Sequence, residues 1–142
     1  MKISLCFKHC KPLSLNKGYT INAKNNQVRR FPSKEYKQLE SVVCMYLAQQ
    51  KNEIKKFNNY FDESKHYIIE ELRFYFPVMK KDNTINKTSG DVFNLPKIVE
   101  DILFKKLNAD DSQVMSGYVH KIHSKEIRIE IDLTIKELKH VI

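Results

Sequence analysis

The stretch Gly90–Val114, GDVFNLPKIVEDILFKKLNADDSQV, contains an amphipathic helix pattern with acidic residues beyond both of its ends. Apolar residues recur there at intervals of three and four, which places on one stripe of a helix Leu95, Ile98, Val99, Ile102, Leu103 and Leu107. Asn94 is suited to cap this helix, and Pro96 falls in its first turn, where the missing N–H removes no hydrogen bond. The pattern therefore predicts a helix over Leu95–Leu107 that packs one side against a core.

The other side of this helix is charged. Lys97 and Asp101 are four residues apart and can pair as solvent-facing charges. Asp91 lies just before the cap, and Asp110 and Asp111 lie just after the helix. Carboxylates suit hard cations such as Mg²⁺, and a lysine beside them suits a phosphate. Two interpretations stay open here, which are a metal site beside a phosphate and an ordinary solvated helix with a polar turn.

Four segments have the alternation or the β-branched and aromatic content of strands. They are Ile3–Phe7, Tyr67–Phe76, Gln113–Lys121 and Glu126–Leu133. The second is apolar enough for a central strand and is ended by Pro77. We expect the last two to form a hairpin through the turn His123–Lys125.

A further helix is expected after Ser33, which reads as its cap. One face of that helix carries Tyr36, Leu39, Val43, Tyr46 and Leu47, and the helix continues into residues 51–56. Before it, Pro12–Tyr19 reads as a loop, followed by an Asn- and Lys-rich connection that ends at Pro32. The element order predicts an α+β fold, a single domain over residues 1–142 in which two helices pack on a mixed β-sheet.

Composition narrows the class of partner. The chain has 142 residues, which fits one domain, and 42% of them are hydrophobic, which is enough for a core. An excess of 25 Lys and Arg over 17 Asp and Glu gives a net charge of +8 and favours a polyanionic partner. No apolar run approaches the ~20 residues of a membrane span, so we expect a soluble, cytoplasmic protein that does not bind a membrane.

The motifs resemble those of a known family. The order Asp91, Asn94, Lys97 and Asp101, followed by Asp110-Asp111-Ser112-Gln113-Val114, resembles the signature of the RusA family of Holliday-junction resolvases. Those proteins are small dimeric endonucleases that phages and prophages often carry. Pro12–Tyr19 (PLSLNKGY) is similar to the loop after the first strand of that family, and Ser33–Tyr36 resembles the opening of its first helix. The resemblance covers most of the chain in the same order.

The resemblance implies a metal-dependent endodeoxyribonuclease that resolves four-way junctions by paired phosphodiester hydrolysis in DNA recombination and repair. Asp91, Lys97 and Asp111 match the catalytic residues, while Asp91, Asp110 and Asp111 match the ligands of Mg²⁺ or Mn²⁺. Asn94 and Asp101 match supporting residues. DNA contacts are expected from exposed loop residues, which are Asn16, Lys17, Tyr19, Arg29, Arg30 and Lys87.

One position departs from the family pattern. The family has Asp-x-Asp-Asn, whereas this chain has Asp91-Val92-Phe93-Asn94, so a phenylalanine stands where a second catalytic aspartate is expected. Four carboxylates are candidates to replace it, and the sequence leaves all of them open: Glu70, Glu71, Asp82 and Glu100. Two alternatives to an active resolvase follow, a relative that binds branched DNA without cutting it and a basic protein-interaction module.

The expected helix also constrains how the site closes. Leu95–Leu107 would span about 20 Å, so Asp111 must fold back along it to share a site with Asp91. A homodimer would bring the two ends together in another way. We therefore hypothesise that Lys97 or part of the carboxylate cluster acts across a twofold interface, which would also give a junction two nicking sites.

Overall fold

The computed structural model describes residues 1–24 and 27–140. Its strands are β1 (Lys2–Lys8), β2 (Tyr19–Lys24), β3 (Gln27–Pro32), β4 (His66–Phe76), β5 (Val114–His123) and β6 (Arg128–Glu137). Its α-helices are α1 (Leu15–Gly18), α2 (Lys34–Gln49), α3 (Lys51–Tyr60) and α4 (Pro96–Phe104). Short 3-10 turns are η1 (Lys87–Ser89), η2 (Val92–Asn94), η3 (Asp111–Gln113) and η4 (Leu138–His140). Among these described residues, no helix has the length and apolar content needed to cross a membrane.

The main sheet has the order β1-β6-β4-β5. β6 pairs antiparallel with β1 and β4, whereas β5 pairs parallel with β4, so the sheet is mixed. This confirms the predicted α+β class with a mixed sheet, and it confirms the segment around Tyr67–Phe76 as a central strand.

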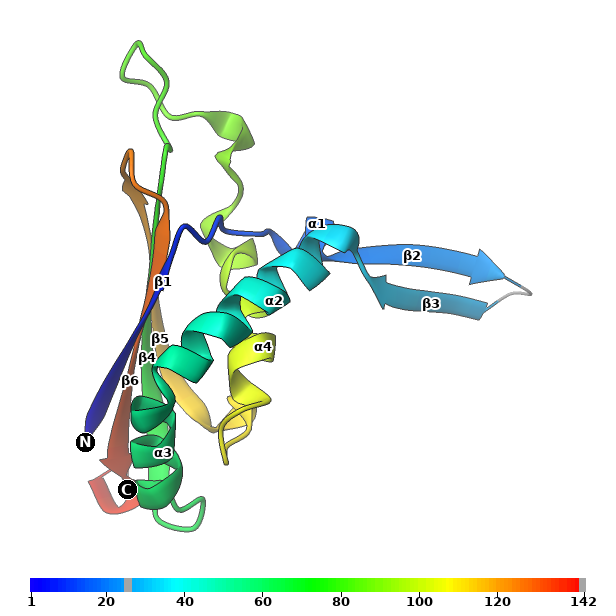
Figure 1. The fold of residues 1–142 in the computed structure, drawn as a ribbon. Helices are drawn as coiled ribbons and strands as arrows, with labels where there is room; N and C mark the ends of the chain where they lie inside the picture. The colour runs from blue at the N-terminus through cyan, green and yellow to red at the C-terminus, as the bar shows by residue number, and fades with distance from the viewer. Residues whose placement is uncertain (25–26, 141–142) are drawn as a thin grey trace.

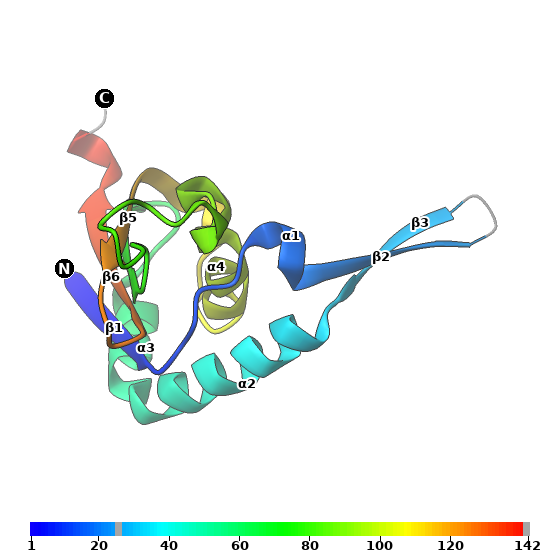
Figure 2. The ribbon, with the colours of Figure 1, turned by 90° about the horizontal axis from the view of Figure 1, so that it is seen from above.

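The two faces of the sheet have different environments. Figures 1 and 2 show α2, α3 and α4 together on one side of it. The strand residues on that side are buried, as Leu5 on β1, Leu72 on β4 and Ile131 on β6 illustrate. The other face is polar, and Arg73 at its centre pairs with carboxylates of β4 and β6 at 2.9–3.1 Å, namely Glu71, Glu130 and Asp132.

The predicted hairpin of the last two strands is wrong. β4 lies between β5 and β6 and pairs with both of them. The connection from β5 to β6 instead passes over the end of β4, where Ser124 N donates to Phe76 O at 3.0 Å. The side chains of β4 are buried at alternate positions, and the strand pairs along both of its edges. It therefore lies between β5 and β6, where a hairpin would have paired these two strands directly.

The connection expected between Tyr19 and Pro32 contains a hairpin that the sequence analysis missed. β2 and β3 pair antiparallel from Tyr19–Pro32 to Lys24–Gln27, and the turn residues 25–26 lie outside the described residues. The hairpin projects away from the rest of the chain (Figures 1 and 2). Its side chains Ile21 and Val28 are exposed, at 67% and 71%, so it lacks the one-sided burial that makes a strand recognisable.

The two predicted helices are also divided differently. The first stops at Gln50 and restarts as α3, because the Gln50 side chain bonds both backbone groups of Cys6 on β1 at 2.8–2.9 Å. The second, α4, begins at Pro96 with Leu95 as its cap residue, so Asn94 does not cap it. It ends at Phe104, which makes it shorter than the predicted Leu95–Leu107.

Ser33 caps α2 as predicted, and it also joins two parts of the chain. Its Oγ accepts from Tyr36 N at 3.1 Å and donates to Lys17 O at 2.7 Å, and the residue is 5% exposed. We expect Ser33→Ala to lower the free energy of unfolding by about 1–2 kcal/mol, because the N–H of Tyr36 loses its cap and the partly buried carbonyl of Lys17 loses its donor.

Urea denaturation would measure this loss. The matched control is Ser14→Ala, since Ser14 precedes α1 without a side-chain capping bond. Equal effects of the two substitutions would contradict the assigned role of Ser33.

Candidate functional site

The centre of the site is Lys97 in the first turn of α4. Its Nζ donates to Asp111 Oδ2 at 2.8 Å and pairs with Asp101 Oδ1 at 3.0 Å. The Lys97–Asp101 pair lies within α4, four residues apart. The Lys97–Asp111 pair also forms within one chain, because the segment after the short α4 folds back to the helix start. The two acceptor bonds raise the pKa of Lys97, so the ammonium stays charged.

The DDSQV segment owes its shape to a local cap. Asp110 Oδ1 accepts from Ser112 N, and Gln113 Oε1 accepts from Asp110 N, both at 2.8 Å. These bonds close a capping box around η3, and the bonds from Ser112 lower the pKa of Asp110. Asp110 is therefore occupied in shaping the turn, and its neighbour Asp111 reaches Lys97.

Two further carboxyl groups, those of Glu70 and Glu100, feel the charge of Asp111. Glu70 projects from β4 into the helix-covered side of the sheet and is 3% exposed, and it hydrogen-bonds Glu100 of α4. No donor among the described residues reaches Glu70 Oε2. Burial raises the pKa of Glu70 to about 9, and the charges of Glu100 and Asp111 add to the shift. Burial also raises the pKa of Glu100.

The structure thereby separates the four candidates for the missing carboxylate. Glu70 and Glu100 are hydrogen-bonded to each other, and burial and, to a smaller degree, the charge of Asp111 raise the pKa of both. Glu71 is on the opposite face of the sheet, bound to Arg73 at 3.1 Å. Asp82 lies in the loop after β4, where its Oδ1 accepts from Thr84 N at 3.0 Å.

The family-like segment before α4 is positioned by a lysine that the sequence analysis missed. Lys121 of β5 donates to Ser89 Oγ and to Gly90 O, both at 2.7 Å. Asp91 follows at once, is exposed, and accepts from Phe93 N at 3.1 Å as the cap of η2. The Phe93 side chain is 82% exposed. Lys121 was detectable in principle, because strand alternation places it on the face that also carries Val119.

The predicted metal ligands do not converge. Asp91 and Asp110 cap separate turns, while Asp111 is bound to Lys97. Within residues 1–24 and 27–140, no three His, Cys, Asp or Glu side chains lie close enough together to hold a metal ion. All three predicted ligands are carboxylates, which are the side chains that hard cations such as Mg²⁺ prefer.

The supporting residues connect the site to the hairpin. Asp101 Oδ2 accepts from the Tyr19 hydroxyl at 3.4 Å, and the Tyr19 ring packs on Tyr36 with centroids 5.4 Å apart. Burial raises the pKa of Tyr19, with the neighbouring Tyr36 and Asp101 adding to the shift. Tyr19 is therefore a packed residue at the base of the β2–β3 hairpin. Asn94 lies half-buried in η2, where its N–H donates to Asp91 O at 3.0 Å.

The other residues predicted to contact DNA lie on several elements. Asn16 and Lys17 are exposed on α1, Arg30 is exposed on β3, and Lys87 is exposed on η1. Arg29 belongs to β3, but its side chain lies outside what the structure describes. All of these residues precede Asp91 in the sequence, and no contact joins them into one cluster among the described side chains.

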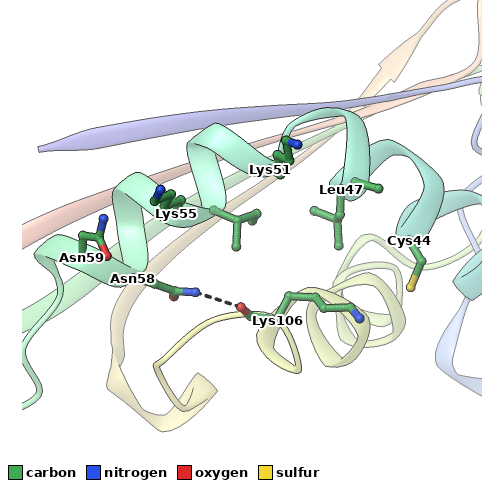
Figure 3. A pocket seen from close by; sticks show the side chains of 9 residues that line it. Cys44, Leu47, Lys51, Lys55, Asn58, Asn59 and Lys106 are labelled. Atoms are coloured by element: carbon green, nitrogen blue, oxygen red, sulfur yellow. Dashed lines mark hydrogen bonds between the residues drawn. The ribbon is translucent and has the colours of Figure 1, made fainter.

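A basic groove of about 420 Å³ lies between α2, α3 and the residues that follow α4 (Figure 3). Its apolar part is Leu47, Ala48 and Ile54, and its cationic part is Lys51, Lys55 and Lys106. Asn58 ties its two sides together by donating to Lys106 O at 3.1 Å (Figure 3). Among the described residues no carboxylate lines the groove, so it adds positive surface at the end of α4 remote from Lys97.

Carboxylates can hold a divalent cation and a lysine can offset phosphate charge, so these groups suit phosphodiester cleavage, and the net positive charge suits a nucleic-acid partner. The profile of the family described as Endodeoxyribonuclease RusA matches residues 11–134 of this chain. The chain therefore belongs to the RusA endodeoxyribonuclease family, which confirms the resemblance found in the sequence. Membership implies nuclease function on Holliday junctions. No curated protein matches the chain.

The buried Glu70 gives a prediction about stability. The pKa of a glutamate in the unfolded chain is 4.5, whereas burial raises the pKa of Glu70 in the folded protein to about 9. Between these two pH values, folding therefore takes up a proton. The contribution of this raised pKa to the free energy of unfolding is complete below pH 4.5 and is lost as the pH rises toward 9. We expect Glu70→Gln to raise Tm by roughly 3 °C or more at pH 8 and by less at pH 5, because glutamine can donate to Glu100 without a charge to bury.

Thermal unfolding at both pH values would check this. Glu71→Gln is the matched control, since it removes the neighbouring charge on the other face of β4. A Glu70→Gln gain that is the same at pH 5 and pH 8 would show that ionisation is not its cause.

Proposed function

We propose that this protein is a Mg²⁺- or Mn²⁺-dependent, structure-specific endodeoxyribonuclease that resolves four-way DNA junctions in the cytoplasm during recombination and repair. The observation that carries the proposal is the Lys97–Asp111 ion pair inside an acidic cluster, in a chain matched to the RusA family over residues 11–134. The 2.8 Å bond joins two residues that the family resemblance assigns to the reaction.

Each group has a chemical role in this proposal. A divalent cation, when bound to the carboxylates, neutralises phosphate charge and lowers the pKa of a bound water. Asp91 and Asp111, with Asp110 beside it, are the family-matched carboxylates for that ion. Lys97 lies where its ammonium can offset the charge that develops on the phosphoryl oxygens. Asp101 holds Lys97 in place through the 3.0 Å pair.

The charge distribution supports DNA as the partner. The chain carries +8, and Lys51, Lys55 and Lys106 around the groove have no ion-pair partner among the described residues. Such lysines bind phosphates without reading bases, so affinity should fall as salt rises. Lys17, Arg30 and Lys87 add cations near the hairpin and the loop before Asp91.

We also propose a homodimer, because a junction must be nicked on two strands. Since Lys97 and Asp111 already meet within one chain, each protomer would carry its own copy of that pair. β5 is an edge strand with Met115 and Tyr118 each 58% exposed, which supports an association at this edge.

The experiment is cleavage of a labelled four-way junction with Mg²⁺ or Mn²⁺, with a linear duplex alongside. We expect paired nicks from the parent, and at least about 100-fold slower cleavage for Asp91→Asn and for Asp111→Asn. Asp82→Asn is the matched control, because Asp82 is an exposed aspartate that caps a turn outside the site.

A second candidate function is favoured by Phe93, which replaces an aspartate of the family pattern. In that case the chain binds branched DNA and does not cut it. Tight, salt-sensitive junction binding without nicks at any metal concentration would establish this alternative. Absence of both binding and nicking would instead favour a protein-interaction module.

A further inference from the structure

Lys121 differs from the other lysines whose side chains the structure describes. It is half-buried on β5, whereas all of the others are exposed. It lies on the helix-covered face of the sheet, because its register partner on β4 is the buried Phe74. Taking an ammonium group partly out of water costs free energy unless a charge nearby compensates it. The position of Lys121 therefore needs an explanation that an exposed lysine does not.

The partners of Lys121 do not compensate its charge. Its Nζ donates to Ser89 Oγ and to Gly90 O, both at 2.7 Å, and both acceptors are neutral. No carboxylate in the described part of the chain pairs with it. The half-buried arginines differ in this respect, because Arg73 pairs with three carboxylates and Arg128 with two. Among the described half-buried lysines and arginines, Lys121 is thus the one that lacks a negative partner.

A structural role alone does not require a charge at this position. The bond to Gly90 holds a residue with φ of 95° and ψ of 156°, a conformation that essentially only glycine adopts. An ammonium group has three N–H donors, and the bonds to Ser89 and Gly90 use two of them. A neutral donor would hold the same two oxygens without a charge to bury. One N–H donor and the whole positive charge of Lys121 are therefore left for a ligand.

Lys121 is also close to a residue that the family resemblance assigns to the reaction. Asp91 follows Gly90 directly and is exposed, so the Lys121 ammonium group is bonded to the residue next to this carboxylate. Lys97 is different, because Asp101 and Asp111 compensate its charge. A DNA phosphate that approaches Asp91 therefore meets an uncompensated cation in Lys121. Lysine is a common ligand of phosphate, which it binds as a point charge.

From these contacts we propose that Lys121 binds a phosphate of the DNA backbone beside Asp91, as a second cation of the site in addition to Lys97. Its other two N–H groups keep their hold on the loop, so one side chain places both Asp91 and the phosphate. The proposal deepens the proposed function and rests on it, because the phosphate is that of the proposed DNA substrate. Lys121 lies outside the motifs that carry the family resemblance, which end at Val114.

The test is the salt dependence of the affinity of the full chain for a labelled four-way junction, measured without divalent ions so that the DNA stays intact. Each phosphate that a lysine neutralises contributes about 0.9 to the slope of log K against log salt concentration. We expect Lys121→Gln and Lys121→Met each to reduce the magnitude of this slope by about one. Lys121→Arg keeps the charge and should keep the slope of the parent.

Two controls separate the charge of Lys121 from its hold on the loop. Ser89→Ala removes one of the two hydrogen bonds of Lys121 but no charge. Lys136→Met removes an exposed lysine from the polar face of β6, which is the opposite face of the sheet. Both controls should keep the slope of the parent. Thermal unfolding of each variant shows whether it is folded.

The outcomes distinguish this phosphate contact from the proposed function. A parent-like slope in Lys121→Gln and Lys121→Met, even with weaker affinity, would overturn the contact and leave Lys121 only its bonds to the loop. If the slope falls as expected but the parent never nicks a junction with Mg²⁺ or Mn²⁺, the phosphate contact stands and the nuclease function fails. If the parent binds no junction at all, both proposals fail.

Discussion

The parallel pairing of β5 with β4 is the constraint on which the site depends. It sets Val114 beside Ile68, so the chain must enter the sheet next to the strand that carries Glu70. Asp111 precedes Val114 by one 3-10 turn and therefore arrives at the start of α4, where Lys97 binds it. A β5–β6 hairpin would have removed β5, and Asp111 with it, from the edge of β4.

The site combines stabilising and destabilising charges. Lys97 neutralises Asp101 and Asp111 in a half-exposed setting, where such pairs contribute modestly to stability. Glu70 and Glu100 oppose folding because burial disfavours their charged forms. A structure built only for stability would place apolar residues at these two positions.

A hydrogen bond joins the β2–β3 hairpin to the acidic residues around Lys97. Tyr19 begins β2 and donates to Asp101, which in turn holds Lys97. At the other side of the site, Lys121 fixes Gly90 and so places Asp91. The segments expected to meet DNA are thus attached to the residues expected to act on it, through bonds of 2.7–3.4 Å.

The sequence by itself determined the fold class, the central strand, the helices around Ser33 and Pro96, and the family, because periodicity, caps and motif order are local properties. It named Lys97 and Asp111 but left Glu70 and Glu100 as two of four carboxylates. Only the tertiary structure separated Glu70 and Glu100 in space from Glu71 and Asp82, since strand pairing and the fold-back after α4 join residues about 30–40 positions apart. The β2–β3 hairpin escaped prediction for a related reason, because both of its faces are solvated.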